Sequence, residues 1–388
     1  MISLTQTLPT LLFLAAQHVN AAPLLASRNA TQQDPSSVWD YIVVGSGAGG
    51  IPVAANLAAS GARTLLIERG PPSSGRWATP KYGGVADPGW KPEWLANSNL
   101  TTFDVMSLYT EIWTGNYSAD IFCPDVSGGI AGCVLGGGTA INAGLWWRPA
   151  SIDWDYVFPG GIGWSSGDMQ NVTDRVFDKI PGTSVPSTDG ELYLQQGAHV
   201  IEDALRQAGW EQEISNNVPN QKTQRRVFTN TTFMYEHGER GGPMATYLVD
   251  AVSRPNFSLW TNTLVERVLR NGSEATGLSV TSAGVGGHNG TVSLSGKGGI
   301  IISAGAFGTP KLLFRSGIGP QDQLEIVKEV EGNLMIDESQ WINLPVGYNL
   351  ADNINVRRAS LCHPSQFQTS TLQNSKTQKL TPHYRRTL

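Results

Sequence analysis

The feature that most constrains this chain is a glycine-rich turn between a short apolar run and a helical pattern. Residues 41–44 predict a buried strand, and residues 51–60, with Ala, Val and Leu at helical spacing, predict a helix that ends at Gly61. A second strand is predicted over residues 64–67, with Glu68 at its carboxyl end. Together these segments predict a β-α-β unit in a parallel sheet.

The turn has the spacing Gly45-x-Gly47-x-x-Gly50 of a dinucleotide-binding fingerprint. In this fingerprint the first glycine permits the tight turn, the second lets backbone approach a pyrophosphate, and the third allows close helix–strand packing. The pyrophosphate would lie at the helix N-terminus, where free N–H groups favour anions. Glu68 is placed to accept hydrogen bonds from a ribose. Glycines that only mark a turn are the alternative, and this stretch does not distinguish FAD from a nicotinamide.

The length of 388 residues allows one large or two ordinary domains. The formal net charge of −5 argues against nucleic acid as a partner, because phosphate binding needs a basic surface. The apolar run over residues 8–16 is too short to span a bilayer, so no membrane partner is expected. With small residues at positions 19–21, residues 1–21 instead predict a secretory signal peptide, although no Lys or Arg precedes the apolar run.

Eight Asn-x-Ser/Thr sequons also favour a secreted, extracellular glycoprotein. They lie at Asn29, Asn99, Asn116, Asn171, Asn230, Asn256, Asn271 and Asn289. Cys123 and Cys133 would close a short loop, which predicts a disulfide in an oxidising compartment, and Cys362 is left over. Residues 71–133 show no sustained period and predict an irregular excursion across the surface, such as a lid.

A second glycine-rich stretch contains three consecutive glycines, 136–138. A loop without side chains would let a planar ligand or a phosphate press against bare backbone. Thr139 and Asn142 supply polar groups beside it. A sharp bend in a buried corner is the alternative interpretation.

The remaining segments predict a polar unit and a return to the first sheet. Residues 151–242 are more polar, with helices predicted over 168–180 and 192–208, and residues 243–252 predict an amphipathic helix. Residues 259–269 and 277–280, with Asn271 and Gly272 between them, predict the strands of a hairpin.

A strand–glycine turn–helix pattern near the C-terminal end repeats the pattern of the opening unit. Residues 300–302 predict a buried strand, followed by a small-residue turn over 303–308. Thr309 and Pro310 then predict the N-cap and the first residue of a helix. This order indicates that the chain returns to the first sheet.

Three motifs in this order resemble the glucose–methanol–choline (GMC) flavoprotein oxidoreductases. The first is the fingerprint with Glu68. Residues 132–142, Gly-Cys-Val-Leu-Gly-Gly-Gly-Thr-Ala-Ile-Asn, are similar to the family's first signature, and residues 305–319 are similar to its second. Within the family, three further stretches are most similar to the flavin domain of fungal cellobiose dehydrogenases. They are residues 187–190, 254–257 and 340–347.

The resemblance implies an α/β fold. It predicts a Rossmann-like FAD-binding domain, with a parallel sheet and a β-meander, and an incomplete α+β substrate domain. The expected ranges are 38–150 and 243–355 for the FAD-binding domain, 151–242 for the substrate domain and 356–388 for an atypical, disordered tail.

The resemblance also implies FAD as the cofactor. The expected reaction is oxidation of a small-molecule sugar or alcohol donor, cellobiose-like at its anomeric carbon, with hydride transfer to the flavin and electrons passed to an external acceptor. Loop 136–144 would line the isoalloxazine, and backbone at Val265 would face the adenine. The predicted cofactor-binding residues are Gly45, Ser46, Gly47, Ala48, Gly49, Gly50, Glu68, Arg69, Gly137, Gly138, Thr139, Asn142, Ala143, Gly144 and Val265.

No catalytic residue and no metal ligand is predicted. The family's catalytic histidine lies near the C-terminus of a longer chain and has no counterpart here. Residues 353–388 contain six Lys or Arg and no Asp, Glu or Gly, which favours a truncated product over a disordered basic extension. Three hypotheses follow: an FAD-dependent sugar dehydrogenase, a catalytically inactive flavin-binding product, and a nicotinamide dehydrogenase.

Overall fold

The computed structural model describes most of the chain between residues 38 and 351. The described residues are 38–77, 90–114, 121–126, 130–158, 160–193, 195–214, 216 and 226–351. The predicted signal peptide, Cys362 and the basic tail lie outside them. In the described part of the chain, no helix combines the length and the apolarity that a membrane span needs.

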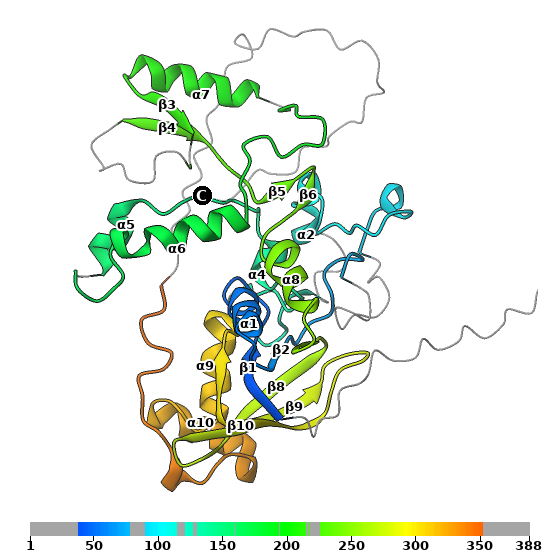
Figure 1. Cartoon of the computed structure of the whole chain (residues 1–388), viewed down its shortest axis with the longest axis vertical. Helices are drawn as coiled ribbons and strands as arrows, with labels where there is room; N and C mark the ends of the chain where they lie inside the picture. The colour runs from blue at the N-terminus through cyan, green and yellow to red at the C-terminus, as the bar shows by residue number, and fades with distance from the viewer. Residues whose placement is uncertain are drawn as a thin grey trace, which may run out of the picture.

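A six-stranded sheet with the order β7-β2-β1-β10-β9-β8 forms the centre of the fold (Figure 1). The strands are β1 (Val38–Val44), β2 (Thr64–Ile67), β7 (Phe257–Trp260), β8 (Thr263–Asn271), β9 (Glu274–Ser282) and β10 (Gly290–Ile302). Strands β7, β2, β1 and β10 pair in parallel, whereas β9 and β8 continue the sheet as an antiparallel meander. The predicted Rossmann-like α/β fold with a β-meander is confirmed.

Strand β1 is buried on both faces because helices and the meander cover the sheet. Val43 packs into the core that contains helix α1 (Gly50–Ala59), while its neighbours Ile42 and Val44 pack into the core that contains the meander. This alternation follows from the two-residue period of a strand. It explains why the apolar run is continuous, as expected for a strand of a covered parallel sheet.

The predicted hairpin is confirmed by the antiparallel pairing of β8 with β9. Its first strand is shorter than the predicted range of residues 259–269, because this range is divided between β7, which pairs with β2, and β8. Strand β7 ends at Trp260, and β8 begins at Thr263. Between them Asn262 has a φ of 51°, in the left-handed region that Asn tolerates better than most residues. Its side chain donates a hydrogen bond to the Val285 carbonyl, which holds this turn.

The predicted start of the helix after β10 is wrong. Helix α9 (Gly305–Arg315) begins directly after the strand, so Pro310 lies inside it rather than at its first position. Pro310 has no N–H to donate to the Ala306 carbonyl, so the helix lacks one internal hydrogen bond. The small residues of the turn allow the helix to start early.

The polar unit predicted over residues 151–242 contains helices and short strands. Its helices α6 and α7 confirm the two predicted helices, although α7 begins later than expected. In Figure 1 the helices α5, α6 and α7 lie in the upper half of the view and the meander lies in the lower half. The elements of this unit are α5 (Ser151–Val157), α6 (Ser166–Lys179), α7 (Gln196–Gln207), β3 (Glu211–Ile214), β4 (Val227–Asn230), β5 (Tyr235–Glu236) and β6 (Glu239–Arg240).

The predicted amphipathic helix over residues 243–252 is a π-helical turn, Met244–Leu248, followed by α8 (Val249–Val252). The irregular excursion predicted over residues 71–133 contains only short helices among its described residues. The other described helices are α2 (Glu111–Thr114), α4 (Gly138–Ile141), α10 (Gln321–Glu331) and the 3-10 turns Glu93–Leu95, Met106–Leu108, Gly332–Leu334 and Glu338–Gln340.

Candidate functional site

A cleft of about 860 Å³ opens at the carboxyl ends of β1, β2 and β10. Its lining includes Val44 and Ile67, the last residues of β1 and β2, and Ser303, which follows β10, and it continues into the segments after them. Because β2 and β10 lie on opposite sides of β1, this is the crevice in which open α/β sheets bind ligands. The volume falls in the range of about 300–1,000 Å³ that is typical of cofactor sites.

In the first glycine loop, close backbone contacts exclude side chains at two glycines, and a third glycine leaves open space for a ligand. Gly45 has a φ of 97°, and a Cβ atom there would lie 2.3 Å from the Ser303 carbonyl oxygen. A Cβ atom on Gly50 would lie 1.8 Å from the Gly45 carbonyl oxygen. At Gly47, by contrast, a Cβ atom would meet no protein atom within 4 Å, so bare backbone faces the cleft.

Two helix N-termini meet at the cleft without a capping side chain. The N-cap residues are Gly49 for α1 and Ala304 for α9, and both line the cleft. Neither helix has an acidic residue in its first turn. Unpaired N–H groups and two helix dipoles therefore favour an anion here, as a pyrophosphate requires.

The second glycine loop touches the first. A Cβ atom on Gly137 would lie 3.1 Å from the Gly47 Cα atom, so a side chain at Gly137 would crowd the first loop. The Ser46 hydroxyl accepts a hydrogen bond of 3.1 Å from the Gly136 N–H and donates one of 2.5 Å to Glu68. One hydroxyl group thus joins the two loops and the acid at the end of β2.

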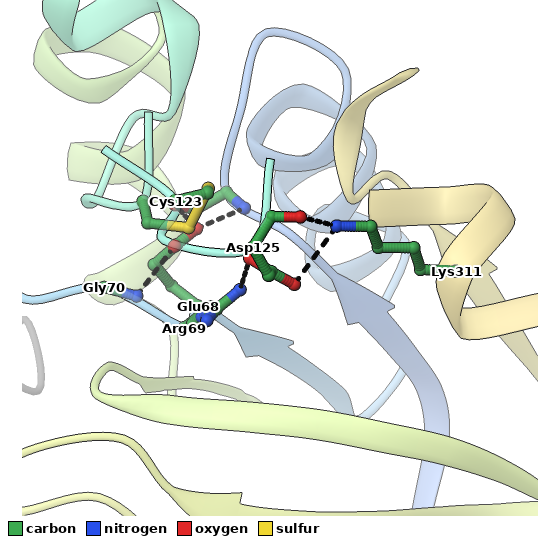
Figure 2. Close-up of a disulfide and its surroundings, with 8 residues drawn as sticks. Glu68, Arg69, Gly70, Cys123, Asp125 and Lys311 are labelled. Carbon is green, nitrogen blue, oxygen red and sulfur yellow. Dashed lines mark hydrogen bonds and ion pairs between the residues drawn. A yellow bond between two sulfur atoms is a disulfide. The ribbon is translucent and has the colours of Figure 1, made fainter. Parts of the chain in front are cut away.

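Glu68 is buried and is held by three donors. Its carboxylate accepts hydrogen bonds from the Ser46 hydroxyl and from the Ser46 N–H at 3.0 Å. It also accepts one of 2.9 Å from the Gly70 N–H (Figure 2). Burial raises the pKa of Glu68 above its ordinary value, and these hydrogen bonds oppose the rise in part. A carboxylate offers about four acceptor positions, so Glu68 retains capacity for ribose hydroxyls.

Asn142 is oriented by a buried arginine that the sequence did not single out. The Asn142 Oδ1 atom accepts hydrogen bonds of 3.0 Å from Nη1 of Arg240 and from the Gly144 N–H. Arg240 also donates to the carbonyls of Thr139 and Phe103. Its pKa is lowered by burial. No sequence pattern marks this contact, because strand β6 lies almost 100 positions from the loop that it holds.

The cleft brings together most of the predicted cofactor-binding residues. Those that line it are Gly45, Ser46, Gly47, Ala48, Gly49, Glu68, Arg69, Gly137, Gly138, Thr139, Asn142 and Val265. The structure places Gly50, Ala143 and Gly144 outside the lining, and Gly144 packs against the Tyr235 ring. Contact of each residue with FAD itself stays a prediction.

Two segments of the lining were not predicted as cofactor-binding. One runs from Ser303 to Thr309 and comprises the short turn after β10 and the start of α9, whose likeness to the opening unit was the available signal. The other surrounds the predicted disulfide, which is confirmed between Cys123 and Cys133. Asp125 lies in this second segment and also lines the cleft.

No described histidine lines the cleft. His288 stacks on Trp260 with ring centroids 3.8 Å apart, and burial lowers its pKa. His237 is exposed, and His199 lies on α7. The described residues therefore contain no histidine placed to act as a base at this site.

Comparisons with known proteins agree with this geometry. A family model described as GMC oxidoreductase matches residues 109–355, and one described as an NAD(P)-binding Rossmann-like domain matches residues 43–111. The glucose-methanol-choline family oxidoreductase mfmG of Annulohypoxylon moriforme is 25% identical, over 83% of this chain and 52% of its own length. Sinalpyl alcohol oxidase Nec3 of Nesocodon mauritianus is 29% identical, over 76% of this chain and 47% of its own length. An oxygen-dependent choline dehydrogenase of Photobacterium profundum is 27% identical, over 84% and 54%.

Solved structures share the fold. An FAD-dependent oxidoreductase from Chaetomium thermophilum superposes with a TM-score of 0.56 at 20% identity, covering 74% of this chain and 49% of its own. Pyridoxine 4-oxidase from Mesorbium loti superposes with a TM-score of 0.53 at 20% identity, covering 74% and 53%. The chain thus spans about half the length of the relatives that it matches.

The donor groups of the cleft fit a dinucleotide with a planar ring. The uncapped helix ends suit a pyrophosphate, Glu68 suits a ribose, and the bare second loop suits a flat ring system. The family match selects FAD over a nicotinamide as the occupant of this cleft. The chain belongs to the GMC oxidoreductase family, and its cofactor is FAD.

Proposed function

We propose that this chain forms the FAD-binding part of an oxidoreductase that oxidises a CH–OH group of a small-molecule donor. The carrying observation is the cleft in which Ser46 joins the two glycine loops. When bound, FAD supplies a hydride acceptor, and the protein supplies position and electrostatics. Two of the similar proteins are named for alcohols, sinalpyl alcohol and choline, which supports a donor of this class. An external acceptor would reoxidise the flavin.

For the donor, we infer a sugar of the cellobiose kind, oxidised at its anomeric carbon. Support comes from the three stretches that resemble fungal cellobiose dehydrogenases. Two tryptophans follow the flavin-facing loop and are candidates to stack a sugar. Trp146 is already packed on Phe177, with centroids 4.6 Å apart, and donates to the Ile180 carbonyl. Trp147 is half exposed, so it is the better candidate.

Anaerobic titration of the purified flavoprotein tests this function. Cellobiose should bleach the visible flavin band, and dithionite should give the same end point. If choline or an aromatic alcohol bleached the flavin but cellobiose did not, the proposed oxidoreductase function would hold, and the sugar would be rejected as the donor. Matched titration with sorbitol, a polyol that has no anomeric carbon, tests whether bleaching requires the anomeric hydroxyl.

A second candidate is a flavin-binding protein without a base of its own. It is favoured by the lack of any histidine in the described lining of the cleft. Proton abstraction from a hydroxyl group needs a base within hydrogen-bond reach. Bound FAD that dithionite reduces but no sugar or alcohol reduces would support this candidate over the first.

We also infer that the chain enters the secretory pathway. The apolar run near the N-terminus and the sequons support this localisation. The Cys123–Cys133 disulfide is consistent with an oxidising compartment. Glycan occupancy of the exposed sequons, measured by mass spectrometry on protein from a secreting host, tests this localisation.

A further inference from the structure

Asp125 forms ion pairs with two cations that line the cleft (Figure 2). Its Oδ1 atom lies 2.6 Å from Nη1 of Arg69, and its Oδ2 atom lies 3.5 Å from Nζ of Lys311. The Lys311 ammonium also donates to the Asp125 backbone carbonyl. Partial burial raises the pKa of Asp125, but Arg69 and Lys311 outweigh it, so the pKa lies below its ordinary value. The carboxylate is therefore charged at neutral pH.

The two cations come from opposite sides of the nucleotide-binding turn. Arg69 follows β2, and Lys311 lies on α9, which follows β10. Because β2 and β10 flank β1 in the sheet, a residue that contacts both cations spans the carboxyl end of β1. The fingerprint turn of residues 45–50 begins at that end. Asp125 thus bridges the two walls of the cleft.

The disulfide fixes the backbone from which Asp125 projects. Cys123 and Cys133 are covalently joined, and hydrogen bonds link the Cys123 N–H to the Ala131 carbonyl and the Cys133 N–H to the Ile121 carbonyl, at 2.9 and 2.7 Å. Asp125 lies only two residues beyond Cys123. Little backbone freedom remains between the disulfide and the carboxylate, so the ion pairs form at a small entropic cost.

We propose that Asp125 is a cofactor-retaining residue, which with Arg69 and Lys311 closes the cleft over bound FAD and slows its release. The same contacts allow an opposite role, in which Asp125 occupies the two cations until the FAD phosphates displace it. The two roles predict opposite signs for Asp125→Asn. If Asp125 retains FAD, its substitution should speed FAD release. If Asp125 instead competes with the FAD phosphates, its substitution should leave FAD bound more tightly.

The rate of FAD dissociation distinguishes the two roles. It can be measured from the rise in flavin fluorescence after the holoprotein is diluted. For Asp125→Asn we expect the rate to increase about threefold to tenfold, the range that two half-exposed ion pairs supply. The increase is expected although the variant removes a negative charge near a diphosphate. An unchanged or slower rate would overturn the proposal.

Asp174→Asn is the matched control. Asp174 is similarly exposed and pairs with Arg148 at 2.5 Å, but neither residue lines the cleft. The control removes the same charge from the chain and should leave the rate of FAD release unchanged. If Asp174→Asn raised the rate of FAD release as much as Asp125→Asn, the effect would be one of net charge, and the retaining role of Asp125 would be overturned.

Lys311→Met supplies a second, independent variant. If Lys311 acts through Asp125, the double variant should release FAD no faster than Asp125→Asn. If the two substitutions had additive effects on the rate of FAD release, Lys311 would attract FAD directly, which contradicts a role through its ion pair with Asp125. Because FAD release needs no donor turnover, failure of this test is distinguishable from failure of the proposed oxidation.

Mild reduction of the holoprotein tests the anchoring. Opening the Cys123–Cys133 disulfide should accelerate FAD release in the wild type and have a smaller effect in Asp125→Asn. Equal acceleration in both proteins would show that the disulfide does not act through Asp125. Circular dichroism of each sample verifies that the fold persists.

Discussion

At the scale of single residues, the Ser46 hydroxyl links the second glycine loop to Glu68. In Ser46→Ala the buried Gly136 N–H loses its acceptor and Glu68 loses one donor. An unsatisfied buried donor costs about 1–3 kcal/mol, so we expect the free energy of unfolding of the apoprotein to fall by that amount. FAD affinity should fall about fivefold, because a buried hydrogen bond is worth about 1 kcal/mol. Urea denaturation and FAD titration measure the two effects.

Ser60→Ala is the control for this prediction. Its hydroxyl donates to the Leu57 carbonyl at the exposed end of α1. Exposed substitutions of this kind change stability by about 0.5 kcal/mol or less. Equal effects of the two variants would show that the Ser46 link contributes nothing specific.

Glu68 should impose a pH dependence on the apoprotein. Its pKa is raised in the folded protein by burial. The folded state therefore binds the proton more tightly than the unfolded state, and stability decreases as pH rises from the unfolded pKa of about 4.5 to the folded pKa. Glu68→Gln lacks this titration. Thermal melting across pH should show the wild type losing stability relative to Glu68→Gln, and parallel curves would contradict the assignment.

At the scale of elements, the turn between β1 and α1 separates folding from binding. Gly50→Ala would place Cβ 1.8 Å from the Gly45 carbonyl oxygen, so we expect a loss of several kcal/mol of stability. Gly47→Ala meets no protein atom within 4 Å, so stability should stay within about 1 kcal/mol of the wild type. Its methyl group would enter the cleft, and FAD affinity should fall at least about tenfold. Normal FAD binding by Gly47→Ala would contradict the placement of the cofactor.

The same elements show what local sequence could predict. The strand–turn–helix at the N-terminus was predictable because its periods and glycine spacing are local. The break at Asn262 was not, because apolar residues on both sides continue the strand pattern. The early start of α9 was missed because Pro310 signals a first turn but is tolerated inside this helix. In each error a position-specific backbone conformation outweighed a general preference.

At the scale of the whole molecule, the site depends on pairings that no local pattern contains. Strands β1 and β10 are separated in the sequence by residues 45–289, yet their parallel pairing brings Ser303 against Gly45. Arg240 reaches Asn142 in the same way. The identity of the two glycine loops was therefore predictable, whereas their contact and the buried arginine beneath them required the tertiary structure.

Long-range packing also makes some sequons less suitable for glycosylation than others. The Asn256 side-chain amide donates to the carbonyls of Ala58 and Ala62, at 2.9 and 2.7 Å, and so holds the end of α1. A glycan on this nitrogen would replace one donor hydrogen and enter a half-buried site. Asn171 and Asn230 are exposed. For protein produced in a secreting host, we expect glycans on the exposed sequons and none on Asn256, as glycopeptide mass spectrometry would measure.

Substitution of the same residues gives the matching stability test. Asn256→Ala should lower the free energy of unfolding by about 1–3 kcal/mol, because two hydrogen bonds at the end of α1 are lost. Asn171→Ala, at an exposed position on α6, should change it by about 0.5 kcal/mol or less. A glycan on Asn256 in folded protein would contradict its structural role. Bare exposed sequons in protein from a secreting host would contradict the proposed secretion, so the two ideas fail separately.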